Sequence, residues 1–447
     1  MTPRPGFLDV IRRERGDGSS SGDQHGGGAG DTGGGLPTGL PGNFLFATGI
    51  ECSYPTIANG SIRRDLLAET GHDDRWEEDL QLVHDLGIRV LRYGLPYHRV
   101  HLGKDRYDWA FADRVLARMR ELEITPILDL LHFGLPDWLG DFQNPEVPVR
   151  FAEYAGAVAR RYPWVRHYTP VNEIFVTAKN SGKTGAWNEQ LKTDAGFVTA
   201  LKHLVAAAIL ATHEIADATP NAIMFQSESA EYTHEMLAVT SDETRLWNKL
   251  RFLALDLLYA HPPDADVCMF ALDNGLTRAE YDWFMVGEPP GYQVVGIDYY
   301  GRNERLIMPD GSMCTAEDVL GWYQIANEYH DRYRKPLMHT ETNVFDAETA
   351  PTWLWKQWAN VLRLRADGVP VFGFTWYSLI DQVDWDIELR EKKGAVNACG
   401  LFDLDRKRRP VADAYESLLK EFGRIPVMPH AELLEVTAQP ARLRSEN

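Results

Sequence analysis

Cysteine is scarce in this chain. Only 4 of its 447 residues are cysteines, and Cys52, Cys268, Cys314 and Cys399 are scattered without a close pair. This spacing argues against a disulfide framework or a zinc site, and it suits the reducing conditions inside a cell. We therefore expect no metal, and nothing in the sequence indicates a cofactor.

Long apolar runs and an excess of positive charge are lacking as well. We expect no apolar run to reach the length that spans a membrane. Arg12, Arg13 and Arg15 follow the few apolar residues at the N-terminus, unlike in a secretory signal. The formal net charge of −19 repels phosphate backbones and anionic lipids. The sequence thus predicts a cytoplasmic protein whose partner is a small molecule, with neither nucleic acid nor membrane as a partner.

A glycine-rich segment precedes the regular part of the sequence. Residues 16–40 read GDGSSSGDQHGGGAGDTGGGLPTGL, a composition that cannot bury enough apolar surface to offset its ordering entropy. Residues 6–13 could form an amphipathic turn that docks, although we favour a frayed terminus. We expect a disordered leader over residues 1–42.

Short apolar runs alternate with longer segments of helical period after the leader. Strands are predicted over residues 43–51, 88–96, 125–132, 166–173, 222–229, 293–300, 336–342 and 371–378. Helices are predicted over residues 74–85, 110–123, 148–162, 195–218, 244–259, 316–332, 352–365 and 410–422. This alternation predicts an α/β fold with a single (β/α)8 TIM barrel over residues 43–422. Residues 423–447 are then a C-terminal extension, which we expect to cap one face and fray.

Ionisable and aromatic residues gather at the ends of the predicted strands, where the active site of such a barrel forms. They are Glu51, Arg92, Asp129, His132, Asn172, Glu173, Glu228, Asp298, Tyr299, Tyr300, His339, Glu341 and Trp376. Stability alone does not require so many such groups at one end of a barrel. We interpret this end as the functional site.

Two glutamates on opposite sides of a barrel mouth suit glycoside hydrolysis. One carboxylic acid protonates the leaving oxygen, and the other attacks the anomeric carbon or activates water. The run YTPVNEIFV, residues 168–176, fits this chemistry because a glutamate among apolar residues must be paired or protonated. Metal-dependent isomerases and enolase-type enzymes are an alternative, but they usually need three or more convergent ligands.

Several motifs carry a family resemblance. TPVNE at the fourth strand and HTETN at the seventh resemble the catalytic strands of the clan A retaining glycoside hydrolases. NFLFATG, LLHFGLPDWL, GIDYYGRNE, FTWYSLIDQVDW and ACGLFDLDRKRRPVADAYE occur in the order found in the family 1 β-glycosidases, and they resemble that family's motifs. The resemblance extends from about residue 43 to about residue 422.

The resemblance assigns roles around the reacting bond. It makes Glu173 the acid/base and Glu341 the nucleophile of a retaining, two-step mechanism. It implies that Arg92 and Tyr300 hold the Glu341 carboxylate ionised, while burial keeps Glu173 protonated at the start of the cycle.

The same resemblance implies a set of sugar-binding residues. His132 and Asn172 match positions that bond to sugar hydroxyls, with Asn172 facing the 2-hydroxyl. Trp376 is expected to form the floor of the first sugar subsite, and Trp385 is expected to line it.

Three acidic residues depart from the family pattern. Glu51 stands near the end of the first strand where the family has a glutamine, Asp298 replaces an asparagine, and Asp384 replaces a glutamate. These residues are expected to bind sugar hydroxyls. Binding of a cationic amino sugar is a second hypothesis for them.

The sequence therefore predicts a retaining β-glycosidase that hydrolyses small β-glycosides, in the manner of a β-glucosidase. A transglycosylase of a biosynthetic pathway is an alternative, in which an acceptor hydroxyl replaces water. A sugar-binding barrel without catalysis is another, although the presence of both glutamates argues against it. The sequence carries no signal for the oligomeric state, the glycone or the aglycone.

Overall fold

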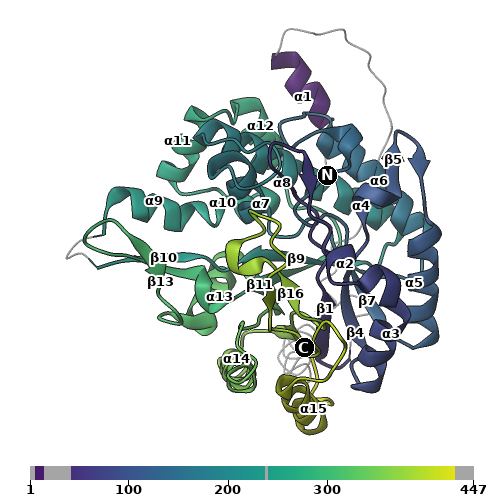
Figure 1. Cartoon of the computed structure of the whole chain (residues 1–447). Coiled ribbons are helices and arrows are strands. Elements are labelled where there is room, and N and C mark those ends of the chain that lie inside the picture. Colours follow the sequence, from purple (N-terminus) through teal and green to yellow (C-terminus); the bar gives the residue numbers. More distant parts are fainter. Residues whose placement is uncertain (1–5, 15–41, 237–239, 428–447) are drawn as a thin grey trace, which may run out of the picture.

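Eight parallel strands close into a barrel at the centre of the molecule (Figure 1). The computed structural model describes residues 6–14, 42–236 and 240–427, with side chains from 11–14 excepted. In spatial order the barrel strands are β1 (Leu45–Ile50), β15 (Val371–Trp376), β14 (Leu337–Glu341), β11 (Tyr292–Asp298), β9 (Ile223–Ser229), β8 (His167–Thr169), β7 (Thr125–Asp129) and β4 (Val90–Gly94). Seven of the predicted strands contain one of them, and the one predicted over residues 293–300 overlaps β11, so the predicted (β/α)8 fold is confirmed.

Helices surround the barrel on its outer face. The outer helices are α3 (His72–Asp85), α5 (Ala110–Glu121), α6 (Val147–Arg161), α8 (Asp194–Ala218), α9 (Asp242–Leu250), α10 (Leu253–Leu258), α13 (Gly321–Tyr333), α14 (Ala350–Ala366) and α15 (Pro410–Phe422). The segment predicted as one helix over residues 244–259 is divided between α9 and α10. Because helices cover the sheet, the barrel strands are apolar on both faces.

Helix α8 is unusually apolar. It has 25 residues, and its most apolar window has a mean hydropathy of 1.6. Among the described residues it is the one helix long and apolar enough to cross a membrane, so the expectation that no run reaches this length is wrong. However, 83% of that window is buried inside the protein, which is typical of the core helix of a globular domain.

The interior of the barrel is filled by branched and aromatic side chains from alternate strand positions. The buried set comprises Leu45, Ala47, Val90, Ile127, Ile223, Phe225, Val294, Met338, Phe372 and Val427. Val427 joins this set from beyond α15, and the Arg365 guanidinium fixes its backbone by donating to the carbonyls of Val427 and Pro426 at 2.9 and 2.7 Å. The residues directly after α15 therefore pack against the barrel core, and residues 428–447 lie outside the described part.

The N-terminal segment contains a docked helix, α1 (Phe7–Glu14). Phe7 is 1% exposed, and its ring lies 4.8 Å from the ring of Trp283 and 5.9 Å from that of Phe284 in α12 (Arg278–Phe284). The frayed terminus favoured from the sequence is therefore wrong for residues 7–14, because two apolar side chains one turn apart, Phe7 and Val10, find a buried site. The rest of the predicted leader, residues 15–41, lies outside the described residues.

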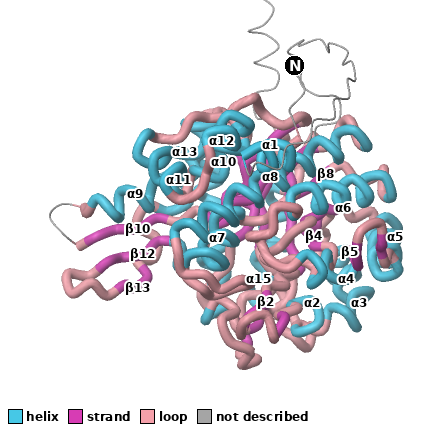
Figure 2. The backbone as a smooth tube through the Cα atoms, turned by 90° about the horizontal axis from the view of Figure 1, so that it is seen from above, coloured by secondary structure: helices cyan, strands magenta, loops and turns pink. Residues whose placement is uncertain are grey.

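Short elements build the loops above the barrel. A three-stranded sheet of β10 (Tyr232–Glu235), β12 (Glu304–Ile307) and β13 (Met313–Thr315) extends to one side (Figure 2). The other small elements are α2 (Leu66–Glu69), α4 (Tyr97–Val100), α7 (Ile174–Ala178), α11 (Ala265–Asp273), β2 (Thr56–Ile57), β3 (Ile62–Arg63), β5 (His101–Gly103), β6 (Arg106–Tyr107), β16 (Gln382–Val383) and β17 (Val396–Asn397). Single turns occur at η1 (Asp137–Leu139), η2 (Lys179–Lys183), η3 (Gly301–Asn303) and η4 (Trp385–Ile387).

Candidate active site

A pocket opens at the carboxyl ends of the barrel strands. Six of the residues predicted from the sequence line it, namely Glu51, His132, Glu173, Tyr300, Glu341 and Trp385. It is also lined by residues that the sequence did not suggest, namely Phe133, Val176, Lys179, Asn180, Trp187, Ser229, Glu231, Arg302, Asn303, Arg305, Gln382 and Glu388. The pocket therefore combines strand-end residues with side chains from the loops.

Glu341 is the last residue of β14, and two donors hold its carboxylate. Arg92 Nη1 donates to Oε1 at 2.5 Å, and the Tyr300 hydroxyl donates to Oε2 at 2.7 Å. Arg92 comes from β4 and Tyr300 directly follows β11. Both oxygens of Glu341 therefore have a donor, which holds the carboxylate in one orientation.

Arg92 lies at the centre of the buried charges. Its second amino group, Nη2, donates to Asn172 Oδ1 at 2.9 Å and lies 3.5 Å from Asp129 Oδ2. Burial alone lowers the pKa of Arg92, but the carboxylates of Glu341, Asp298 and Asp129 outweigh that effect and raise it. The guanidinium thus stays charged and orients both Glu341 and Asn172.

The backbone of Glu173 has a left-handed conformation, with φ 42° and ψ 65°. This conformation is costly for a residue with a side chain, and it persists only where the surroundings enforce it. The Glu173 N–H donates to the Ser227 carbonyl at 2.9 Å. The next two amides, of Ile174 and Phe175, donate to the buried Glu228 carboxylate at 3.0 and 3.2 Å. Strand β9 therefore fixes the turn that aims Glu173 into the pocket.

Glu173 is chemically unlike Glu341. Burial raises the pKa of Glu173 well above its ordinary value, and the negative charges of Asp298 and Glu341 raise it further. One carboxyl oxygen from each of these three residues lies within 4.8 Å of the other two. No ion pair to Glu173 occurs in the described part of the chain, so the surroundings favour the protonated form of this carboxyl.

Asp298 is fully buried at the end of β11. A register shift in the pairing of β11 with β14 places it opposite Glu341, and its Oδ1 accepts from the Ser227 hydroxyl at 3.1 Å. Burial and then the Glu341 charge raise the pKa of Asp298 well above its ordinary value. Asp298, Glu173 and Glu341 thus crowd three carboxyls into one buried site, and their mutual repulsion favours the protonated forms of Glu173 and Asp298.

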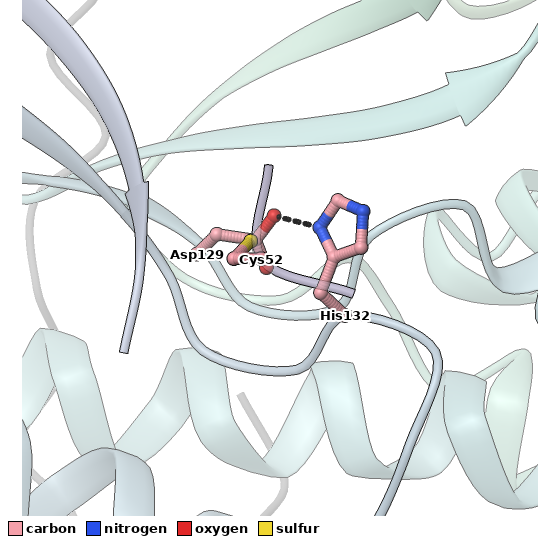
Figure 3. Close-up of side chains that lie close together, drawn as sticks. All are labelled: Cys52, Asp129 and His132. Carbon is pink, nitrogen blue, oxygen red and sulfur yellow. Dashed lines mark hydrogen bonds and ion pairs between the residues drawn. The ribbon is translucent and has the colours of Figure 1, made fainter. Parts of the chain in front are cut away.

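His132 belongs to a compact group with Asp129 and Cys52 (Figure 3). Its Nδ1 lies 2.8 Å from Asp129 Oδ2, and its Nε2 lies 3.4 Å from Asn172 Nδ2. Burial alone lowers the pKa of His132, but Cys52 and Asp129 together raise it above its ordinary value. The Asp129 contact fixes the imidazole ring, so His132 presents its other nitrogen toward Asn172.

Glu51 lines the same wall of the pocket at the end of β1. Its Oε1 accepts from the backbone N–H of Ser53 at 3.0 Å and from the Ser53 hydroxyl at 2.5 Å. Its Oε2 accepts from Gln382 Nε2 at 2.9 Å, and Gln382 itself lines the pocket. Glu51 and Gln382 therefore form one polar surface, in which the glutamine follows β15 and not β1.

Trp376 does not form the floor of the pocket. Its side chain is fully buried in the core, and Nε1 donates to the Cys399 carbonyl at 2.9 Å. The next residue, Tyr377, turns inward because neighbouring side chains alternate in direction along a strand. Its ring is nearly parallel to that of His132, with centroids 6.5 Å apart, and lies 5.7 Å from the Arg92 guanidinium. Neither Trp376 nor Tyr377 is among the residues that line the pocket, so the floor predicted at Trp376 is not found there.

Asp384 does not reach the pocket either. Its carboxylate accepts from the backbone N–H groups of Lys393, Gly394 and Ala395 at 2.8 to 2.9 Å, and it pairs with Arg64 at 3.0 Å. Asp384 therefore organises the loop between η4 and β17, and it is not among the residues that line the pocket. The neighbouring Trp385 does line the pocket, as predicted.

Charged loop residues surround the pocket entrance, and no sequence motif pointed to them. Lys179 forms an ion pair with Glu231. Arg305 lies 3.6 Å from Glu231 and 3.5 Å from Glu388. The one sequence feature that could have identified these residues is their closeness along the chain to the strand ends. Lys179 lies six residues after Glu173, and Glu231 lies two residues after the end of β9.

Two groups of side chains have the donor types of a metal site. One is Cys52, Asp129 and His132, and the other is Glu173, Asp298 and Glu341. The Arg92 guanidinium lies 2.5 Å from Glu341 and 3.5 Å from Asp129. A cation in either group would have to overcome repulsion from this arginine.

Comparisons with known proteins agree with this geometry. The sequence pattern of Glycosyl hydrolase family 1 matches residues 55–244. A bifunctional beta-D-glucosidase/beta-D-fucosidase from Bifidobacterium breve is 33% identical over 170 residues, which are 31% of this chain and 37% of that relative. The matched part thus spans little more than a third of that relative.

Longer matches exist at lower identity. Beta-glucosidase A from Thermotoga maritima is 21% identical over 404 residues, covering 79% of this chain and 87% of the relative. The solved family 1 β-glucosidase from Thermotoga maritima superimposes with a TM-score of 0.70 at 19% identity, over 86% of this chain and 99% of that one, and so shows the same fold. The chain thus resembles glycosyl hydrolase family 1 in sequence over residues 55–244, and it shares the fold of a solved family 1 member at low identity.

Proposed function

We propose that this protein hydrolyses small β-glycosides with retention of configuration, with Glu341 as nucleophile and Glu173 as acid/base. The observation that supports it best is the unequal environment of two carboxyls whose oxygens lie within 4.8 Å of each other. Retaining glycosidases have their two carboxyls about 5 Å apart, whereas inverting enzymes leave room for a water between them. Glu341 has two donors and Glu173 has a raised pKa.

In the first step the Glu341 carboxylate attacks the anomeric carbon and forms a glycosyl ester. The bond to the leaving oxygen breaks at the same time, and Glu173 gives its proton to that oxygen. Arg92 and Tyr300 keep the attacking carboxylate ionised and aligned. The leaving group departs as a neutral alcohol or phenol.

In the second step the ester is hydrolysed. Glu341 has lost its charge in the ester, so one of the causes of the raised pKa of Glu173 disappears. Glu173, now ionised, takes a proton from a water molecule that attacks the anomeric carbon. The ester bond breaks, the β-configured sugar is released, and both glutamates return to their starting states.

Several residues are suited to hold the sugar during both steps. Asn172 is fixed by Arg92 at 2.9 Å, beside Glu173, where it can bond to the 2-hydroxyl. His132, Glu51 and Gln382 line one wall with donors and acceptors for further hydroxyls. Two of the relatives described above are named as β-glucosidases, which supports glucose as the first glycone to test.

A nitrophenyl glycoside panel with glucoside, galactoside, fucoside, xyloside, mannoside and glucosaminide tests this proposal. We expect release from at least one neutral sugar. Incubation with the matching 2-deoxy-2-fluoro glycosyl fluoride should then slow turnover and add one fluorosugar to the peptide that contains Glu341. Turnover with the label on another residue would contradict the assignment, and inversion of configuration would contradict the mechanism. Preference for the glucosaminide would instead support the amino-sugar hypothesis.

A further inference from the structure

Arg302 in η3 differs from every other cation that lines the pocket. Its guanidinium carbon lies 5.0, 4.2 and 5.9 Å from the ring centres of Tyr300, Phe345 and Trp385. Its one hydrogen bond in the described part of the chain runs from Nη1 to the Trp385 carbonyl at 3.3 Å. No carboxylate of the described residues lies within ion-pairing distance of it.

The neighbouring cations are already neutralised. Lys179 pairs with Glu231, and Arg305 lies between Glu231 and Glu388. Among the arginine and lysine side chains that line the pocket, Arg302 is thus the one to which the described residues supply no carboxylate partner. A guanidinium removed from water without an anionic partner is costly, and ring faces offset only part of that cost.

Burial lowers the pKa of Arg302, but a guanidinium stays charged at neutral pH. Its remaining N–H groups are therefore available to a ligand. A planar fork of donors matches a carboxylate, which can accept two parallel hydrogen bonds. An anionic group in the pocket would supply the partner that the protein does not.

The position of Arg302 indicates which part of a substrate would carry this anion. Arg302 follows β11, whereas the sugar-binding wall of Glu51, His132 and Gln382 follows β1, β7 and β15. Arg302 also lines a second cavity of about 640 Å³, which contains Phe345 and Trp353. A leaving group that departs from the sugar toward β11 would reach both the guanidinium and these aromatic rings.

We propose that Arg302 binds a carboxylate on the leaving group, so that the preferred substrates are β-glycosides of aromatic hydroxy acids. This inference rests on the proposed function. Arg302 would act on specificity and not on the bond-breaking step, because Tyr300 stands between it and Glu341.

The test compares the β-glycoside of 4-hydroxybenzoic acid with that of its methyl ester, on the glycone preferred in the nitrophenyl panel. We expect kcat/KM to be at least tenfold higher for the acid, and the ratio to fall in 0.5 M salt. The neutral ester is the better leaving group, so leaving-group chemistry alone would favour the ester.

Variants assign this preference to one side chain. Arg302→Gln should bring the acid-to-ester ratio to one or below, and Arg302→Lys should give an intermediate ratio because it keeps the charge but loses the fork. Arg118→Gln, which removes the same charge from the outer helix α5, should keep the wild-type ratio.

Three results would overturn the proposal: a wild-type ratio at or below one, a ratio that survives in Arg302→Gln, or an Arg302-dependent preference for nitrophenyl β-glucuronide, which would place the anion on the sugar. If no panel sugar is hydrolysed, the proposed function fails instead. The dissociation constants of the two benzoate glycosides, measured by calorimetry, then decide whether Arg302 selects the acid.

Discussion

The carboxyl ends of β14 and β8 each present a glutamate to the same pocket, but the two surroundings are opposite in kind. Glu341 meets a guanidinium and a phenol that favour its ionised form. Glu173 meets apolar burial and two carboxylates, which favour its protonated form. The difference teaches that the barrel sets the state of each carboxyl through the neighbouring strands, since Arg92 comes from β4 and Asp298 from β11.

The largest effect is expected from Glu341→Gln. The amide cannot form the glycosyl ester, so kcat should fall by ~10⁴-fold or more on every substrate, as for removal of a nucleophile elsewhere. Steady-state rates on the preferred nitrophenyl glycoside check this. The amide oxygen can still accept from Arg92, and the amide nitrogen can donate to the Tyr300 hydroxyl, so the melting temperature should change little. Residual activity above one per cent of wild type would remove Glu341 from the nucleophile role.

Glu173→Ala should show a smaller loss that depends on the leaving group. Proton donation contributes roughly 10²–10⁴-fold in such reactions, and it matters most for poorly acidic leaving groups. We therefore expect a large loss for a methylphenyl glycoside and a small loss in the first step for a dinitrophenyl glycoside. Added azide should accelerate turnover of the dinitrophenyl substrate by attacking the ester without a base, and it should yield the β-glycosyl azide.

An equal loss on both substrates would contradict the contrast between the two glutamates. Formation of the α-azide in the Glu173 variant would contradict it in another way, because it would mean that the roles of the two carboxyls are exchanged. Azide should have no effect on the wild type, whose base is already in place.

The two glutamates and Arg92 could be predicted because strand ends are visible as the last residues of apolar runs, and parallel strands converge at one end of a barrel. The sequence could not predict whether Trp376 or Tyr377 points toward the inside of the barrel. Both are aromatic, and the strand period does not tell which of two neighbours points inward until the register of β15 is known.

The sequence also could not predict which loop residues line the pocket. Asp384 was expected in the pocket because of its place in a motif, but the tight turn at residues 393–395 captures its carboxylate. Lys179 and Arg302 belong to short turns whose direction depends on packing against other loops. Such contacts link residues far apart in the chain, and hydrophobic period carries no information about them.

Glu228 offers an intermediate effect that bears on the Glu173 side of the comparison. Burial raises its pKa from 4.5 to about 8, although the amides of Phe175 and Ile174 lower it. Between these two pH values the folded protein holds a proton that the unfolded chain has lost. The contribution of Glu228 to stability therefore decreases as the pH rises from 4.5 to about 8.

Glu228→Gln should remove this dependence, because glutamine resembles the protonated acid and does not titrate. We expect the melting temperature of the variant, relative to wild type, to increase steadily over this pH range and to level off above it. Differential scanning fluorimetry in matched buffers measures this. A constant difference would mean that Glu228 is ionised throughout, held so by the two amides that follow Glu173.

The smallest effect on activity is expected at Asp384, a carboxylate near the pocket that belongs to neither environment. Burial alone raises its pKa, but the amides of residues 393–395 and Arg64 lower it below the ordinary 3.8. Its ionised form thus stabilises the fold at neutral pH, and this contribution is lost as the pH falls below that value. Asp384→Asn should cost about 1–3 kcal/mol of unfolding free energy at pH 7, with a smaller difference at pH 3, while kcat/KM stays within about threefold of wild type. A hundredfold rise in KM without loss of stability would instead mean that Asp384 binds the sugar directly. The turn at residues 393–395 would then have to open when substrate binds.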